Sequence, residues 1–283
     1  MLLAFSLWAL TLLSGAAQAE PAPGPAQEEL ADPTPWQAQI YSSFKGWTDE
    51  QLATREAWDL AHKCGGSLIA PGWVLTAAHC INQERIANGH RVRLGATTID
   101  RDEGTTYHID RMVRHADWDK AKKLNDVALV HFVADQDTVE DDGAIEAIAL
   151  YDGPPLPAGV PVFASGWGKA EEGKDQGHQA ELTRVDLTTV DCADYPKIKA
   201  WTVDNQLCAA GEEAGSDTCE GDSGGPLVMT SEGRPPMLVG IVNYGFGCYR
   251  EESAGVYLRI DRDNLTDWIG RAMAADPSVD EVH

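Results

Sequence analysis

The segment CEGDSGGP, residues 219–226, decides how the rest of the chain is interpreted. Its serine stands between an aspartate and two glycines, a composition that is unsuited to a helix and costly within a strand. Such a loop is favoured where one hydroxyl must be held in a fixed place. The alternative is an ordinary surface turn, because Gly, Asp, Ser and Pro are all common turn residues.

Two other segments contain the groups that a nucleophilic serine requires. A serine hydroxyl is a weak nucleophile unless a base lies beside it and a third group orients that base. The segment LTAAHC at residues 75–80 contains His79, and NDVALV at residues 125–130 contains Asp126. With Ser223, these motifs in this order resemble the trypsin/chymotrypsin family of serine proteases. The resemblance extends from about residue 36 to about residue 273.

Strand patterns dominate the chain. Apolar segments at residues 66–69 and 73–76 flank a Pro-Gly turn, which predicts a hairpin, and residues 127–133 are mostly apolar, as in a buried strand. Many short strands between Gly and Pro turns favour an all-β barrel or sandwich. The resemblance implies an all-β fold of two six-stranded antiparallel β-barrels, at about 36–140 and 158–258, followed by a C-terminal α-helix.

Two segments depart from the strand pattern. Near the C-terminus, Asp263 is placed to cap a helix with one apolar face. That face comprises Leu265, Trp268, Ile269, Ala272 and Met273. We therefore expect one protease domain over residues 36–275 and a tail at 276–283. Residues 42–61 form a longer segment than the family often has there, with a possible helix at 49–58, and are either a decorative loop or a lip on the substrate cleft.

The N-terminal residues predict export. Residues 1–19 are uncharged and largely apolar and end in Ala-Gln-Ala, as in a secretory signal peptide. We expect residues 20–35 to lack fixed structure and the protein to be secreted or periplasmic. Six cysteines behind a signal peptide suggest disulfides, whose pairing the sequence leaves open, and zinc is disfavoured because no Cys-x-x-Cys pair occurs. The resemblance implies the pairs Cys64–Cys80, Cys192–Cys208 and Cys219–Cys248.

The formal net charge of −23 excludes nucleic acid and anionic membranes as natural partners. No later segment has the roughly 18–20 apolar residues that a membrane helix requires. We expect a monomer without a cofactor. Its partners would be polypeptide substrates with basic residues and, by the resemblance, protein protease inhibitors.

The resemblance assigns roles to individual residues. Ser223 is the nucleophile, His79 the base and Asp126 the group that orients it, and the N–H groups of Gly221 and Ser223 form the oxyanion hole. The substrate pocket has Asp217 at its floor. It also includes the Thr218 hydroxyl, Glu220 at the entrance, glycine walls at Gly245 and Gly255, and Asn243, which stands where a serine usually supports the triad aspartate. These roles predict cleavage after Arg or Lys.

The usual activation device of the family is missing. An Ile-Val-Gly-Gly amino terminus normally pairs with the aspartate before the catalytic serine, here Asp222, but residues 22–25 read APGP and the first basic residue is Lys45. A buried carboxylate needs a partner. We consider His62, Lys169 and Lys174 as candidates.

The calcium loop of the family is also altered. Of its carboxylates only Glu103 is kept, with Ala96 and Thr106 at the end positions, so we predict no metal there. The sequon at Asn264 we interpret as structural.

Two alternatives to a trypsin-like endopeptidase stay open. One is a protein held zymogen-like or acting as a binding module, and the other is an esterase that uses the same serine.

Overall fold

The computed structural model describes residues 28–29, 34–43, 46–134, 144–170, 177–199, 205–211, 217–248, 253–262 and 264–283. The expected signal peptide lies outside these residues. Within them, no helix is both long and apolar enough to cross a membrane.

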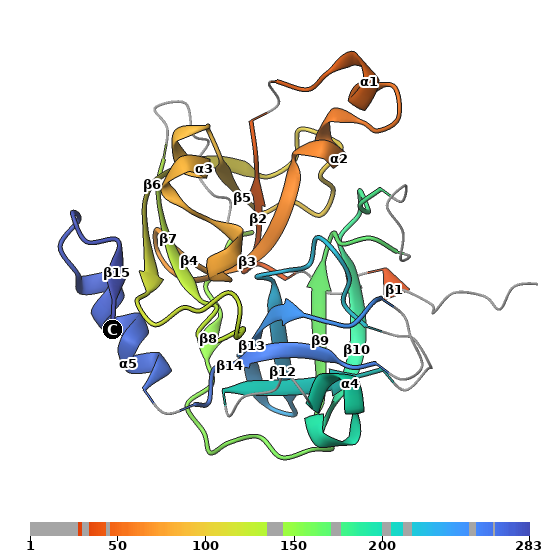
Figure 1. Ribbon diagram of the computed structural model, residues 1–283, viewed down its shortest axis with the longest axis vertical. Helices are drawn as coiled ribbons and strands as arrows, with labels where there is room; N and C mark the ends of the chain where they lie inside the picture. The colour runs from red at the N-terminus through yellow and green to blue at the C-terminus, as the bar shows by residue number, and fades with distance from the viewer. Residues whose placement is uncertain are drawn as a thin grey trace, which may run out of the picture.

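The N-terminal half of the chain forms a closed six-stranded antiparallel barrel (Figure 1). Its order is β6-β5-β2-β3-β4-β7, and pairing of β6 with β7 closes it. The strands are β2 (Gln37–Tyr41), β3 (His62–Ala70), β4 (Trp73–Thr76), β5 (Arg91–Leu94), β6 (Thr105–His115) and β7 (Ala128–Val133). The predicted hairpin is confirmed as β3 and β4.

The second half repeats this architecture in the order β10-β11-β14-β13-β12-β9, closed by pairing of β10 with β9. Its strands are β9 (Pro161–Gly166), β10 (Thr183–Val190), β11 (Gln206–Ala210), β12 (Pro226–Ser231), β13 (Arg234–Tyr244) and β14 (Gly255–Arg259). Two further short strands pair with members of this barrel: β1 (Glu28–Glu29) with β10 and β8 (Ala149–Leu150) with β13. The predicted two-barrel fold is confirmed.

Helices are short except at the C-terminus. They are α1 (Asp49–Leu52), α2 (Ala57–Ala61), α3 (Gln83–Ala87), α4 (Pro196–Lys199), α5 (Leu265–Ala274) and the 3-10 turns η1 (Ala78–Cys80) and η2 (Cys192–Asp194). The predicted apolar face of α5 is confirmed, since four of its five residues are buried in the core of the first barrel. Its N-cap is Asn264, in a left-handed conformation, and Asp263 lies outside the described residues.

Three segment predictions need correction. The possible helix at 49–58 is two short helices, because α1 ends after one turn and Glu56 is extended. The segment 20–35 contains β1, whereas we expected it to have no fixed structure. The tail contains β15 (Glu281–Val282), which pairs in parallel with β6, and Trp268 Nε1 donates a hydrogen bond to Val282 O over 2.8 Å.

Three disulfides join the predicted pairs: Cys64–Cys80, Cys192–Cys208 and Cys219–Cys248. Each closes a loop within one barrel or between neighbouring loops of it. The third ties the segment before Ser223 to the end of β13, so that the serine loop is held covalently at its base.

Candidate active site

The loop that contains Ser223 is attached to the first barrel by its backbone. Gly65 N, on β3, donates to Ser223 O over 2.8 Å, and Cys80 Sγ lies 3.5 Å from the same oxygen. Gly224 fits only because it has no side chain: its φ is +80°, and a Cβ there would lie 2.1 Å from Thr76 Oγ1. A loop of the second barrel therefore lies against the η1 turn of the first.

His79, on η1, is oriented by Asp126, which lies just before β7. Its ring nitrogen Nδ1 is 2.7 Å from Asp126 Oδ2, and its backbone N donates to Asp126 Oδ1 over 2.9 Å. The Asp126 side chain is 5% exposed, whereas the His79 side chain is 30% exposed. Because the carboxylate accepts at Nδ1, the Nε2 atom of the neutral ring is left with its lone pair, as a general base requires.

The loop of Ser223 is held beside the η1 turn of His79 by backbone contacts. Among the described residues, no hydrogen bond joins the Ser223 hydroxyl to the His79 ring, and such contacts are often long in proteins without substrate. The placement of Ser223 beside η1 rests instead on its bond to Gly65 and its contact with Cys80, the residue after His79.

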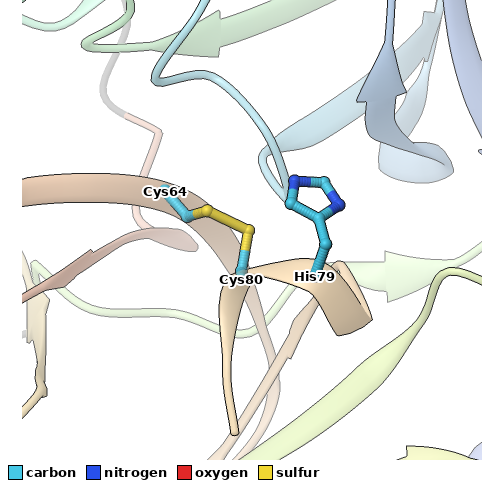
Figure 2. A group of neighbouring side chains, drawn as sticks. All are labelled: Cys64, His79 and Cys80. Atoms are coloured by element: carbon cyan, nitrogen blue, oxygen red, sulfur yellow. A yellow bond between two sulfur atoms is a disulfide. The ribbon is translucent and has the colours of Figure 1, made fainter. Parts of the chain in front are cut away.

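A disulfide lies directly beside His79. Figure 2 shows the Cys64–Cys80 bond next to the imidazole, and the three side chains are close enough to resemble a metal-binding cluster. Metal ligation by cysteine requires a free thiolate. The two sulfurs are bonded to each other, so this cluster is a structural disulfide and does not provide a metal-ligand set.

The loop before Ser223 presents two backbone donors that the protein does not use. Asp222 N donates to Cys219 O, Gly224 N to Val242 O and Gly225 N to Asp222 O, over 2.8–3.1 Å. Within the described part of the chain, the N–H groups of Gly221 and Ser223 make no hydrogen bond. Gly221 has φ +107°, a conformation that favours glycine. The loop can therefore stabilise a negative oxygen at this position.

Asp222 is half-buried within this loop, and its partners differ from those that we considered. Its carboxylate accepts hydrogen bonds from Gly168 N at 2.8 Å and Cys219 N at 2.9 Å, and burial raises its pKa to about 6. No cation of the described residues forms an ion pair with it.

The candidate partners bind elsewhere or lie outside the described residues. His62 Nε2 donates to Gly221 O over 3.0 Å, and Lys169 Nζ donates to Glu220 Oε2 over 2.7 Å. Lys174 belongs to a segment that the structure does not describe. The prediction that His62 or Lys169 holds Asp222 is therefore wrong, because backbone amides take that place.

Asp217 is a buried carboxylate with one oxygen left open. Its Oδ1 accepts from Thr218 N at 2.7 Å and lies 3.4 Å from the Thr218 hydroxyl, whereas Oδ2 has no hydrogen-bond partner among the described residues. Burial, with the nearby charge of Asp222, raises the pKa of Asp217 to about 7, although Thr218 opposes the shift. A Cβ on Gly245 would lie 3.7 Å from Oδ2 and one on Gly255 only 2.5 Å from Oδ1. Gly255 is thus packed against the acid too closely for a side chain, whereas Gly245 is at ordinary contact distance.

The other two predicted pocket residues, Glu220 and Asn243, differ in burial and in hydrogen bonding. The Glu220 side chain is 72% exposed and pairs with the buried ammonium of Lys169. Asn243 is buried, but neither its amide nitrogen nor its amide oxygen has a hydrogen-bond partner in the described part of the chain. Among the described residues, Asn243 therefore does not supply the support that a serine usually gives the triad aspartate at this position, and the side chain of Asp126 accepts from His79.

Glu103, the carboxylate kept from the calcium loop of the family, accepts hydrogen bonds from two threonines of its own loop. It accepts from Thr97 N at 2.9 Å, Thr97 Oγ1 at 2.7 Å, Thr98 N at 3.1 Å and the Thr98 hydroxyl. Burial raises the pKa of Glu103, but these hydrogen bonds outweigh it and lower the pKa to about 2. The carboxylate thus cross-links a turn of its own loop.

Comparison with known sequences places this site in a family. The model of the trypsin family matches residues 26–269. The chain belongs to the trypsin family of serine proteases. It is 38% identical to the vitellin-degrading protease of Bombyx mori over 74% of this chain and 75% of that protein. It is 36% identical to trypsin of Squalus acanthias, over 76% and 87%, and 34% identical to anionic trypsin of Canis lupus familiaris, over 76% and 81%.

Sequence reasoning missed a group of charged and titratable residues behind the loop of residues 220–223, named the oxyanion loop after the role that the resemblance implies. Asp59 is buried and contacts His178, whose side chain is 9% exposed, and Arg55 pairs with Asp59. Neither Arg55 nor Asp59 belongs to a recognisable motif. The only signal was the unusual length of the segment that contains them.

Proposed function

We propose that this member of the family is a secreted serine endopeptidase that hydrolyses peptide bonds after Arg or Lys. The buried, half-satisfied carboxylate of Asp217 carries this proposal. Its Oδ2 atom has no hydrogen-bond partner among the described residues and lies near Gly245, where even a Cβ would be 3.7 Å away. A guanidinium or ammonium from a substrate is the group that would satisfy it.

In the proposed reaction Ser223 Oγ attacks the scissile carbonyl carbon while His79 Nε2 takes its proton. The proton is later given to the leaving amine, and water hydrolyses the acyl-enzyme by the same steps. Asp126 holds the imidazole through Nδ1 and stabilises the imidazolium. The N–H groups of Gly221 and Ser223 receive the oxyanion, and losing one such donor costs about 3–4 kcal/mol of transition-state stabilisation.

Hydrolysis of an Arg p-nitroanilide tests the proposal. The wild-type protein should release the chromophore and the Ser223→Ala variant should not. A serine-directed phosphonate should label the wild type alone. Equal background from both proteins, with no labelling, would refute it. Preference for an apolar over a basic substrate would refute only the role of Asp217.

A second candidate is a protein with the protease fold that is held inactive or only binds its partners. The observation in its favour is that Asp222 has no cationic partner among the described residues. The unused N–H groups of Gly221 and Ser223 favour the enzyme. Sequencing the amino terminus of the exported protein would identify which residues precede β1 in the mature form and test the proposed secretion.

A further inference from the structure

The segment between β2 and β3 carries a buried ion pair. Arg55 approaches Asp59 through both its Nε atom and a terminal nitrogen, the latter 2.5 Å from Asp59 Oδ1. The Asp59 side chain is 6% exposed and the Arg55 side chain 23%. Burial raises the pKa of Asp59, but the hydrogen bonds from Arg55 and from His178 N outweigh it, and the net shift is downward. Asp59 is therefore an ionised acceptor inside the protein.

Asp59 reaches across the sequence to His178. Asp59 Oδ1 accepts from His178 N at 2.7 Å and lies 2.8 Å from His178 Nδ1. His178 Nδ1 also faces a second acceptor, Asp59 O at 3.0 Å, and one donor, Arg55 Nη2 at 3.1 Å. The two acceptors are the nearer groups, so the contacts favour the tautomer with the hydrogen on Nδ1. The side chain of His178 is 9% exposed, so this contact is shielded from water.

His178 in turn lies beside Gly221 of the oxyanion loop and beside His62 of β3. Its ring lies edge-on to that of His62, with centroids 4.7 Å apart, and it fills the space beside Gly221, where a Cβ would be 2.6 Å from His178 Cδ2. His178 also forms an isolated antiparallel bridge with Lys169. The residue thus lies against both segments that hold the loop.

These two segments fix the peptide groups on either side of the Gly221 α-carbon. Lys169 N donates to Glu220 O over 2.9 Å, and His62 Nε2 donates to Gly221 O over 3.0 Å. The Glu220 carbonyl and the Gly221 N–H belong to one trans peptide and point in opposite directions. Anchoring that carbonyl on Lys169 therefore aims the Gly221 N–H away from Lys169.

His62 is suited to its part in this arrangement. Burial lowers its pKa to about 3, so the ring is neutral, and Gln39 Nε2 lies 3.2 Å from its Nδ1 atom. With Nδ1 accepting from the amide, Nε2 must carry the hydrogen, which it donates to Gly221 O. The His62 ring cannot be displaced without moving Gln39 or His178.

We propose that Asp59 and His178 are positioning residues, which hold the Gly221 peptide so that its N–H points to the oxyanion. The inference rests on the proposed function. Under this inference the long segment at 42–61 is more than a decorative surface loop, because it supplies Asp59, which helps to position the Gly221 peptide. Asp222 has only backbone partners among the described residues, so the orientation of this loop depends on contacts of this kind.

The test compares Asp59→Asn and His178→Ala with Glu56→Gln in the full-length protein. Glu56 is exposed, its side chain makes no capping hydrogen bond, and its change removes the same charge from the same segment. Three quantities are measured. They are kcat and KM on an Arg p-nitroanilide, the inhibition constant of a peptide aldehyde ending in Arg, and that of benzamidine. The hemiacetal oxygen of the aldehyde adduct occupies the oxyanion hole, whereas benzamidine reaches only the Asp217 pocket.

We expect kcat and aldehyde affinity to fall tenfold or more in both variants. This loss is smaller than the roughly 100–1000-fold loss on removal of an oxyanion-hole donor. KM, benzamidine affinity and the Glu56→Gln protein should change less than twofold. The double variant should lose no more than the worse single variant, since both changes interrupt one chain of contacts. Unchanged aldehyde affinity, or an equal loss of benzamidine affinity, would overturn the inference.

A crystal structure of the Asp59→Asn variant tests the same idea without turnover. We expect the hydrogen bond between His62 and Gly221 O to be lost or the Gly221 peptide to be turned. An unchanged peptide would overturn the inference, whatever the activity. Conversely, a wild-type protein that neither hydrolyses the Arg p-nitroanilide nor reacts with the phosphonate would contradict the proposed function.

Discussion

Binding of a cation in the pocket should be coupled to release of a proton from Asp217. Burial raises the pKa of this carboxyl group to about 7, so much of it is protonated and neutral below that pH. An arginine-like ligand pairs with the ionised form only. With a pKa of about 7, roughly 1% of the group is ionised at pH 5 and about 90% at pH 8. The dissociation constant of benzamidine should therefore rise about 100-fold from pH 8 to pH 5, which is about 2.7 kcal/mol.

Calorimetric titration of the Ser223→Ala variant measures this coupling without chemistry at the scissile bond. At pH 6 about 0.9 proton should be released for each benzamidine bound, which is obtained by comparing buffers of different ionisation enthalpy. The Asp217→Asn variant is the control. It lacks the titrating carboxyl group but keeps the other groups that titrate nearby. Because the coupling is attributed to Asp217, the weaker binding of this variant should be nearly independent of pH.

An affinity of the Ser223→Ala variant that is flat between pH 5 and pH 8, with no proton release, would refute this reasoning. It would mean that Asp217 is already ionised in the free protein. Water or a cation would then bind Oδ2 in the free protein, and the inference that Oδ2 is free to accept a substrate cation would be wrong.

Three further changes have defined outcomes. Gly255→Ala places a Cβ 2.5 Å from Asp217 Oδ1 and should lower kcat/KM on an Arg p-nitroanilide at least tenfold; equal turnover would show that the wall can move. Burial raises the pKa of Asp222 to about 6 from an ordinary value of 3.8, so the folded protein binds this proton more tightly than the unfolded chain. Stability to urea should fall by about 2.4 kcal/mol between pH 4 and pH 7 relative to Asp222→Asn, and a relative rise would show that a cation reaches the carboxylate. Replacing Cys219 and Cys248 by Ala opens a loop of sequence separation 29 and should cost about 3–4 kcal/mol in the free energy of unfolding, measured by denaturant titration; a loss below about 1 kcal/mol would contradict the loop-entropy reasoning.

Residues within recognisable motifs were predictable from the sequence. His79 contacts Asp126 as expected, and all three disulfides join the expected cysteines. The face of α5 was also predictable, since its apolar residues recur at helical spacing and are buried. In each case one local pattern, or one family pattern of paired positions, determines the contact.

Contacts between unrelated loops were not predictable. Asp59 and His178 are 119 residues apart and meet only because the two barrels bring their loops together. The prediction for Asp222 failed for a related reason, since it considered side-chain cations whereas the fold supplies backbone N–H groups from Gly168 and Cys219. The helix expected at 49–58 stops early because α1 buries no side chain, so packing adds nothing to a helix that is too short to be stable alone.

Contacts within the motifs and contacts between loops have different roles at the site. In the proposed function the motif residues supply the reacting groups, but four consecutive residues of the oxyanion loop are each held by a residue outside it. Glu220 O is bound by Lys169, Gly221 O by His62, the Asp222 side chain by Gly168, and Ser223 O by Gly65. Because rigid donors are what make an oxyanion hole effective, the reactivity of the motif depends on anchors that the motif does not contain. Substitutions at such anchors should therefore lower kcat while the nucleophile, the base and the pocket acid stay unchanged.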